Sequence, residues 1–311
     1  MNKKATRDSF GEALAQLALE NENVVALSAD LAGSARSRAM IKVAPERHFN
    51  LGIAEADMIG VAAGLAASGK IPFASSFAMF AAGRAYDQVR NMVGYPHLNV
   101  KICASHAGLS AVENGATHQA LEDIALMRVI PGMAVIQPCD DRETQQAIKA
   151  ISEYDGPVYV RLSREPVEEI NDESYHFEIG RGMIIHEGSS PIAMFATGCL
   201  VQQSLKTLKL LKQQGIDPTL INIHTIKPID EELIVRYAGK SDFIVSLEEH
   251  SIKGGLGSAI AEVTAARCPV RQLFIGTEDV YGESGRHEQL LDKFGLSGEK
   301  IAQKILAFRV R

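Results

Sequence analysis

The feature that most constrains the fold is an alternation, along the whole chain, of short runs rich in Val and Ile with longer segments of helical period. The runs are too short for helices and too continuously apolar for half-exposed strands, so they indicate strands buried on both faces. Strands that alternate with helices favour a parallel sheet with helical crossovers. The sequence therefore predicts an α/β fold built on parallel sheets.

The same alternation divides the chain into two units. A chain of 311 residues is long enough for about two domains. Residues 166–182 carry several acidic side chains and little periodic hydrophobicity, which indicates a surface linker. We therefore expect a first domain over residues 1–165 and a smaller α/β domain over residues 183–311. The expected helices are 10–20, 54–67, 82–93, 143–153, 200–214 and 256–266, and the expected strands are 24–28, 100–105, 134–138, 158–162, 192–196, 218–223 and 243–248.

Composition limits the classes of partner. The net charge of -6 argues against nucleic acid or an anionic membrane as the main partner. The chain has no apolar stretch near its N-terminus and no run of 18 apolar residues, so we expect a cytoplasmic protein. Its cysteines are far apart, which predicts buried thiols in place of disulfides or a zinc site: Cys103, Cys139, Cys199 and Cys268.

Three blocks of the first unit contain candidate functional residues. Glu55 precedes a helix of small residues, and viewed alone it would be a solvent-facing acid in a first helical turn. Phe77 and Phe80, one helical turn apart, would alone be core aromatics. A Gly-rich loop after an expected strand holds His106 and His118, and it offers no third ligand, so we expect no metal there.

The order of these blocks along the chain resembles the transketolase family, whose members use thiamine diphosphate. The resemblance runs from Arg7 to about Ile305 and implies a pyrimidine-binding domain followed by a transketolase C-terminal domain. In the second unit it rests on Glu248-Glu249-His250, Gly254-Gly255-Leu256-Gly257-Ser258 and Gly282-Glu283-Ser284-Gly285. The resemblance implies packing and dimerisation as the role of those segments.

The resemblance also implies roles for individual residues. Glu55 would hydrogen-bond the aminopyrimidine ring of the cofactor and so help remove a proton from the thiazolium C2. His106 and His118 would bind sugar hydroxyls and move protons. The other implied contacts are with the cofactor, from Phe77, Phe80, Asp30 and Leu31, and with the substrate, from Arg7, Ser34, Asn114 and Arg164.

The sequence departs from the family pattern at two positions. Gly83 stands where the family commonly has a Tyr, so any contact from that side of the ring must come from another residue. Asn114 stands where typical members have an Asp that contacts a hydroxyl beside the aldehyde. A carboxylate only accepts hydrogen bonds whereas an amide also donates, so we expect an altered selectivity for the acceptor sugar.

One motif of the family is missing. The chain has no Gly-Asp-Gly sequence, the motif that in transketolases belongs to the domain holding the diphosphate and its divalent metal. The resemblance therefore implies a separate N-terminal subunit, which shares thiamine diphosphate with this chain and binds the Mg²⁺ or Ca²⁺. Two copies of each chain are expected. The implied activity is transfer of a two-carbon ketol unit from a ketose phosphate to an aldose.

Three other interpretations remain. The β subunit of a 2-oxo acid dehydrogenase has the same two domains and a separate partner, but its substrate needs no sugar-phosphate clamp. A deoxyxylulose-phosphate synthase relative is suggested by Arg84-Ala85-Tyr86-Asp87-Gln88, although such enzymes usually carry both halves in one chain. A non-catalytic regulatory subunit could keep the fold, and the retention of Glu55 speaks against it.

Overall fold

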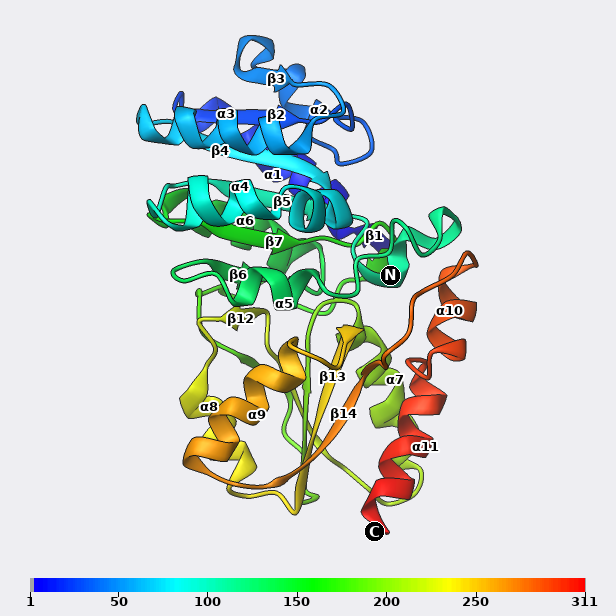
Figure 1. The fold of residues 1–311 in the computed structure, drawn as a ribbon. Coiled ribbons are helices and arrows are strands. Elements are labelled where there is room, and N and C mark those ends of the chain that lie inside the picture. Colours follow the sequence, from blue (N-terminus) through cyan, green and yellow to red (C-terminus); the bar gives the residue numbers. More distant parts are fainter. Residues whose placement is uncertain (1–2, 311) are drawn as a thin grey trace.

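A computed structural model describes residues 3–310 and contains two main sheets flanked by helices (Figure 1). The strands of both sheets are mostly parallel, so the predicted α/β fold is confirmed. No described helix combines the length and the apolar character that a bilayer-spanning segment needs.

The first sheet has seven strands in the order β12-β6-β7-β5-β4-β2-β3. All neighbours are parallel except β12, which pairs antiparallel with β6. Of its inner strands, β2, β5, β6 and β7 are buried along their whole length, as the Val- and Ile-rich runs predict, and β4 is buried except at Ile71. The strands are β2 (Val24–Ser28), β3 (His48–Asn50), β4 (Ile71–Phe77), β5 (Lys101–Ser105), β6 (Ala134–Ile136), β7 (Val158–Arg161) and β12 (Thr225–Lys227).

Helices cover both faces of this sheet (Figure 1). The longest are α1 (Thr6–Glu20), α3 (Glu55–Ala67) and α6 (Asp141–Glu153), and shorter ones are α2 (Arg38–Ile41), η1 (Pro45–Arg47) and α5 (Asp123–Arg128). The single helix expected over residues 82–93 is instead two π-helical segments, η2 (Met79–Arg84) and η3 (Val89–Gly94), around α4 (Tyr86–Gln88). The apolar pattern of this short segment does not distinguish an α-helical from a π-helical spacing. It therefore predicted a helix but not the type of helix.

The second sheet has five strands in the order β14-β13-β10-β11-β9, of which only β9 is antiparallel to its neighbour. The strands are β9 (Met183–His186), β10 (Ile192–Ala196), β11 (Thr219–Asn222), β13 (Phe243–Ser251) and β14 (Arg271–Thr277). The helices are α7 (Leu200–Lys212), α8 (Glu231–Ala238), α9 (Leu256–Arg267), α10 (His287–Lys293) and α11 (Gly298–Arg309).

Two short pairings join distant parts of the chain. Strand β12 follows β11 of the second sheet in sequence but completes the edge of the first sheet. Strand β8 (Pro166–Glu168) lies inside the segment expected to be a linker and pairs antiparallel with β1 (Lys3–Ala5). The same segment buries Tyr175 and Phe177 in the core of the first unit. It is therefore packed structure, which its acidic surface residues concealed.

A buried ion pair connects the two sheets. Arg161, in β7, donates from Nε to Asp123 Oδ2 at 2.8 Å, and each side chain is only 1% exposed. The Tyr159 hydroxyl donates to the same carboxylate at 2.7 Å. The guanidinium also donates to the carbonyls of Ala120 and Glu249, both at 3.0 Å, and Glu249 belongs to β13. These hydrogen bonds offset the cost of removing both charges from water.

Replacing Asp123 by Ala should destabilise the protein by about 3–5 kcal/mol, because Arg161 would stay buried without its counter-charge. Urea unfolding followed by circular dichroism measures the change. Asp279→Ala is the matched control, since Asp279 forms an exposed ion pair with Lys253, and it should leave the midpoint nearly unchanged. Equal effects of the two substitutions would contradict a structural role for the buried pair.

Candidate active site

Most of the candidate residues lie at the carboxyl ends of the parallel strands in the first sheet. Asp30 follows β2, Phe77 ends β4, His106 follows β5 and Arg164 follows β7. The carboxyl ends of parallel strands open onto the crevice in which α/β proteins commonly bind ligands. The topology alone therefore gathers residues that are far apart in the sequence.

Glu55 is the first residue of α3 and is 1% exposed, so it does not face solvent. The hydroxyl of Ser76 donates to its Oε1 at 3.4 Å, and Arg84 donates from an Nη atom to its Oε2 at 2.8 Å. The N-terminal end of a helix also favours a negative charge. The negative charge of the Glu55 carboxylate is thus buried but stabilised by Arg84, Ser76 and the helix N-terminus.

Four of the candidate rings contact one another. The rings of Phe77 and Phe80 are nearly parallel, with centroids 6.1 Å apart and an interplanar angle of 19°. The ring of His106 lies 3.8 Å from Phe77, and His118 meets Phe80 edge-on at 5.1 Å. The structure therefore brings both predicted aromatics and both predicted histidines into one cluster.

Arg84 contacts both Glu55 and Phe80, and the sequence did not assign it to the site. Its guanidinium lies 4.3 Å from the centroid of the Phe80 ring while it donates to Glu55. The π-helical turn of η2 carries both Phe80 and Arg84. Arg84 was visible in the sequence only as part of a resemblance to another enzyme family, because its pairing with Glu55 depends on this local geometry.

A second, basic group borders the cluster. Arg7 lies with one Nη atom 3.0 Å from His106 Nε2 and donates to the Ser34 carbonyl at 3.2 Å. Because a guanidinium only donates, His106 Nε2 must accept, and its Nδ1 faces the Ser105 hydroxyl at 2.9 Å. The Nε atom of Arg7 is buried without a hydrogen-bond partner. Buried donors without a partner are uncommon in folded proteins, which makes Arg7 a candidate ligand for an external acceptor.

The electrostatics of this group hold His106 neutral. Burial, together with the positive charges of Arg7 and Arg164, lowers the pKa of His106 to about 3. Burial and the nearby charge of Arg36 also lower the pKa of Arg7. Arg36 was not predicted, although it stands two residues after Ser34 in the same loop. In the free chain His106 is therefore a hydrogen-bond partner and not a reservoir of protons.

The remaining candidates lie at the rim. Arg164 contacts Glu113 Oε2 at 3.2 Å and Asn114 Oδ1 at 3.5 Å, so the predicted acceptor residue lies beside the predicted phosphate ligand. Asp30 and Leu31 lie on the loop after β2, where Asn50 accepts from the Asp30 backbone amide at 2.8 Å. Among the described residues, no hydrogen bond joins Asp30 or Leu31 to the cluster around Glu55.

A cleft of about 660 Å³ opens next to this cluster. Its walls include Met79 and Thr117 from the first unit and Ser251 and Tyr281 from the second. Tyr281 is 89% exposed. The cleft is therefore bordered by both units, and Met79 and Thr117 are the chain neighbours of Phe80 and His118.

Residues 2–169 match the transketolase pyrimidine-binding domain, and residues 180–301 match the transketolase C-terminal domain. The chain therefore belongs to the transketolase family. Within the family, it corresponds to these two domains in this order.

Individual relatives agree with this assignment. A putative transketolase C-terminal section of Methanocaldococcus jannaschii is 50% identical over 97% of this chain and 96% of its own length. A 6-deoxy-6-sulfo-D-fructose transketolase subunit of Clostridium sp. (strain MSTE9) is 42% identical over 96% of this chain and 92% of its own length. The solved structure of a split-gene transketolase, an inactive β4 tetramer, is 45% identical with a TM-score of 0.91, and the match covers 97% of each chain.

The low pKa of His106 gives a titration that NMR can follow. Between pH 8 and pH 5 the imidazole signals of His106, assigned with His106→Gln, should not shift, because protonation occurs near pH 3. In Arg7→Gln the pKa should rise, since a neighbouring positive charge is removed, but it should stay below the ordinary value because the ring remains buried.

The same shift has a consequence for stability. The unfolded chain binds a proton at this position below about pH 6.5 and the folded chain does not, so the contribution of His106 to stability is lost as the pH falls from 6.5 towards 3. His106→Gln should weaken this acid destabilisation. A His106 signal that titrates near pH 6.5 would refute the neutral assignment.

Proposed function

We propose that this chain is the C-terminal subunit of a two-chain transketolase, which moves a two-carbon ketol unit from a ketose phosphate to an aldose. The observation that carries the proposal is a buried carboxylate, Glu55, facing an aromatic cluster beside a basic group with an unsatisfied donor. Glu55 with the aromatic cluster suits a flat heterocycle that carries a proton, and the basic group suits an anionic substrate.

The residues fit the pyrimidine end of thiamine diphosphate. When bound, this cofactor supplies the carbanion chemistry that ketol transfer requires. We propose that Glu55 holds a proton on the pyrimidine ring, that Phe77 and Phe80 provide the apolar walls, and that Asp30 and Leu31 line the approach. Glu55 is 1% exposed, so a polar ring atom that reaches it would meet the carboxyl group with little competition from water.

Arg84 must change its contacts when the cofactor binds. Its planar guanidinium lies over Phe80 and donates to Glu55, and a bound aminopyrimidine would need the same ring face and the same carboxylate. Arg84 is half exposed, so it can swing into solvent at little cost. In the free chain Arg84 pairs with the buried charge of Glu55. Without Arg84 that charge would be buried and unpaired, which costs considerable free energy.

The basic group is proposed as the anion clamp of the substrate. Among the described residues, Arg7 has a buried Nε atom without a hydrogen-bond partner, and Arg164 is 29% exposed and contacts Glu113, Glu165 and Asn114. Ser34, whose carbonyl accepts from Arg7, is proposed as a further ligand. His106 and His118 would bind the sugar hydroxyls between the clamp and Glu55. A neutral His106 can accept and donate one hydrogen bond, which suits that task.

A second polypeptide is part of the proposal. The chain has no Gly-Asp-Gly motif, so we propose that an N-terminal subunit holds the diphosphate and its Mg²⁺ or Ca²⁺, with two copies of each chain in the assembly. The β subunit of a 2-oxo acid dehydrogenase and a deoxyxylulose-phosphate synthase relative differ in the donor, since both would decarboxylate a 2-oxo acid. A regulatory subunit would leave the mixture inactive.

We expect the purified chain to be inactive alone and to gain ketol transfer activity when it is mixed with its N-terminal partner, thiamine diphosphate and Mg²⁺. Fructose 6-phosphate and pyruvate are compared as donors. In the same mixture Glu55→Ala should nearly abolish exchange of the cofactor C2 proton into deuterated solvent while the complex still assembles, because only a proton contact is lost.

Arg84→Met is the matched variant, since Arg84 contacts Glu55 but is proposed to leave on binding. It should keep most of the exchange rate. Turnover by the chain alone would disprove the two-chain proposal, and use of pyruvate in place of the sugar phosphate would favour the alternatives. Undiminished exchange in Glu55→Ala would remove Glu55 from the mechanism.

Replacing Arg164 by Gln should raise KM for a sugar phosphate by about tenfold or more and change kcat less, because the clamp binds a part of the substrate that does not react. The assay measures both constants for fructose 6-phosphate, for 6-deoxy-6-sulfofructose and for an uncharged ketose. Arg181→Gln is the control, since Arg181 forms an exposed pair with Glu178. An equal loss with the uncharged ketose would show that Arg164 is not an anion ligand.

A further inference from the structure

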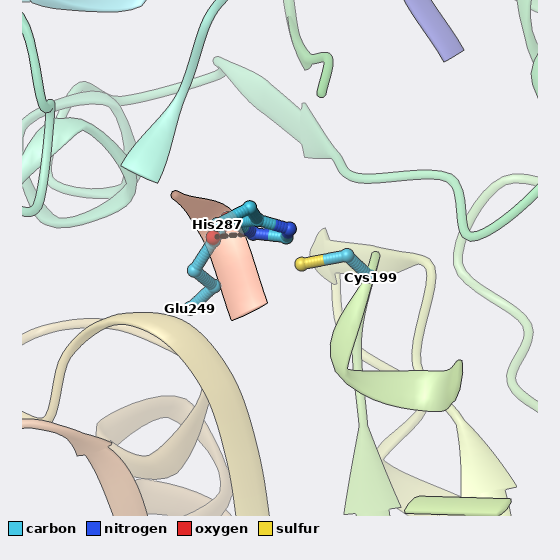
Figure 2. A group of neighbouring side chains, drawn as sticks. All are labelled: Cys199, Glu249 and His287. Carbon is cyan, nitrogen blue, oxygen red and sulfur yellow. Dashed lines mark hydrogen bonds and ion pairs between the residues drawn. The ribbon is translucent and has the colours of Figure 1, made fainter. Parts of the chain in front are cut away.

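A group of three potential metal ligands lies in the second unit and includes none of the residues assigned to catalysis. Cys199, Glu249 and His287 offer ligand atoms that all lie within 4.8 Å of one another. Figure 2 shows the Cys199 sulfur directed toward the His287 ring, with Glu249 hydrogen-bonded to that ring. Cys199 precedes α7, Glu249 lies in β13, and His287 opens α10.

We propose that Cys199, Glu249 and His287 form a binding site for a thiophilic divalent cation such as Zn²⁺. One thiolate, one imidazole and one carboxylate are three ligands of the kind that zinc prefers, and a water would complete a tetrahedron. Ligand bonds of about 2.0–2.3 Å place neighbouring ligand atoms about 3.3–3.8 Å apart. The Glu249 and His287 atoms, 2.9 Å apart, would have to separate slightly, and the Cys199 sulfur, within 4.8 Å of both, would have to approach by at most about an ångström.

The charge of the site favours a dication. The Glu249 side chain is 1% exposed, and its described hydrogen bond is to His287 Nε2 at 2.9 Å. A thiolate and a carboxylate carry two negative charges, so a bound Zn²⁺ makes the buried group neutral. The carboxylates of Glu165 and Glu288 also act on His287 from nearby. Arg161, which donates to the Glu249 carbonyl, has its own charge balanced by Asp123.

Local structure gives the cysteine a fixed place, because Cys199 is a buried free thiol at the N-terminal cap of α7. Burial and the Glu249 carboxylate raise the pKa of this thiol, so an entering metal must displace its proton. Binding replaces the thiol proton and the Nε2 proton that His287 shares with Glu249, so both leave as the metal enters. The His287 side chain is 14% exposed and provides the way in. Sequence spacing gave no sign of the site, because its ligands come from three separate elements.

The position of the site gives the ion a structural consequence. Gly108 has a φ of +60°, and a Cβ there would lie 2.6 Å from the Glu249 carboxylate. Gly108 begins η4 (Gly108–Asn114), in the loop that carries His106 and His118. A cation bound by Cys199, Glu249 and His287 would therefore link α7, β13 and α10 next to the loop that carries His106 and His118.

The test uses the full chain without partner or cofactor, so its outcome is independent of the proposed catalytic function. After treatment with a chelator and dialysis against Zn²⁺, elemental analysis should find one tightly bound zinc per chain. Co²⁺ in its place should give a thiolate-to-cobalt charge-transfer band and the visible spectrum of a tetrahedral site. Excess Mg²⁺ should not displace either ion, because a thiolate site disfavours it.

Cys199→Ala and His287→Gln should each lose the bound zinc and the charge-transfer band, with Kd raised more than about tenfold. The amide of His287→Gln can still donate to Glu249, so this variant decides the matter if Cys199→Ala does not fold. Cys268→Ala is the control, since Cys268 is a partly exposed cysteine elsewhere, and it should bind zinc like the wild type. The same zinc content in all variants, or no charge-transfer band in the wild type, would overturn the proposal.

Discussion

The ion pair between Arg161 and Asp123 is the interaction on which the rest of the architecture depends. It fixes α5 against β7, and the same guanidinium reaches the carbonyls of Ala120, at the end of the histidine loop, and of Glu249, in the second sheet. A single buried cation thus sets the position of three segments. The cluster around Glu55 can be preorganised only because that loop has a defined place against both units.

The candidate site separates two kinds of electrostatics within one crevice. On one side, Glu55 is buried and its charge is met by Arg84. On the other side, Arg7 and Arg164 lie close enough to keep His106 uncharged. The aromatic and imidazole rings of Phe77, Phe80 and His106 form one connected cluster between these two charged groups.

The sequence predicted the regular parts of the fold well, because buried parallel strands have a clear signal. Val24–Ser28 has the limits that its apolar run indicates, and Glu55 opens α3 close to the expected start. Three-residue strands such as β8 and β12 are too short to show a period, and their partners lie far away in the chain. Arg84 and Arg36 were missed because their roles come from a π-helical turn and a folded loop, which local patterns do not encode.

Strand β12 also bears on how the chain could be divided. It covers the β6 edge of the first sheet with backbone from the second unit. If residues 1–165 were produced alone, that edge would present unpaired amide and carbonyl groups, the template on which strands of other molecules add. The second unit therefore protects the first sheet from edge-to-edge association. A fragment truncated at the apparent domain boundary would be prone to aggregate, for a reason unrelated to its active site.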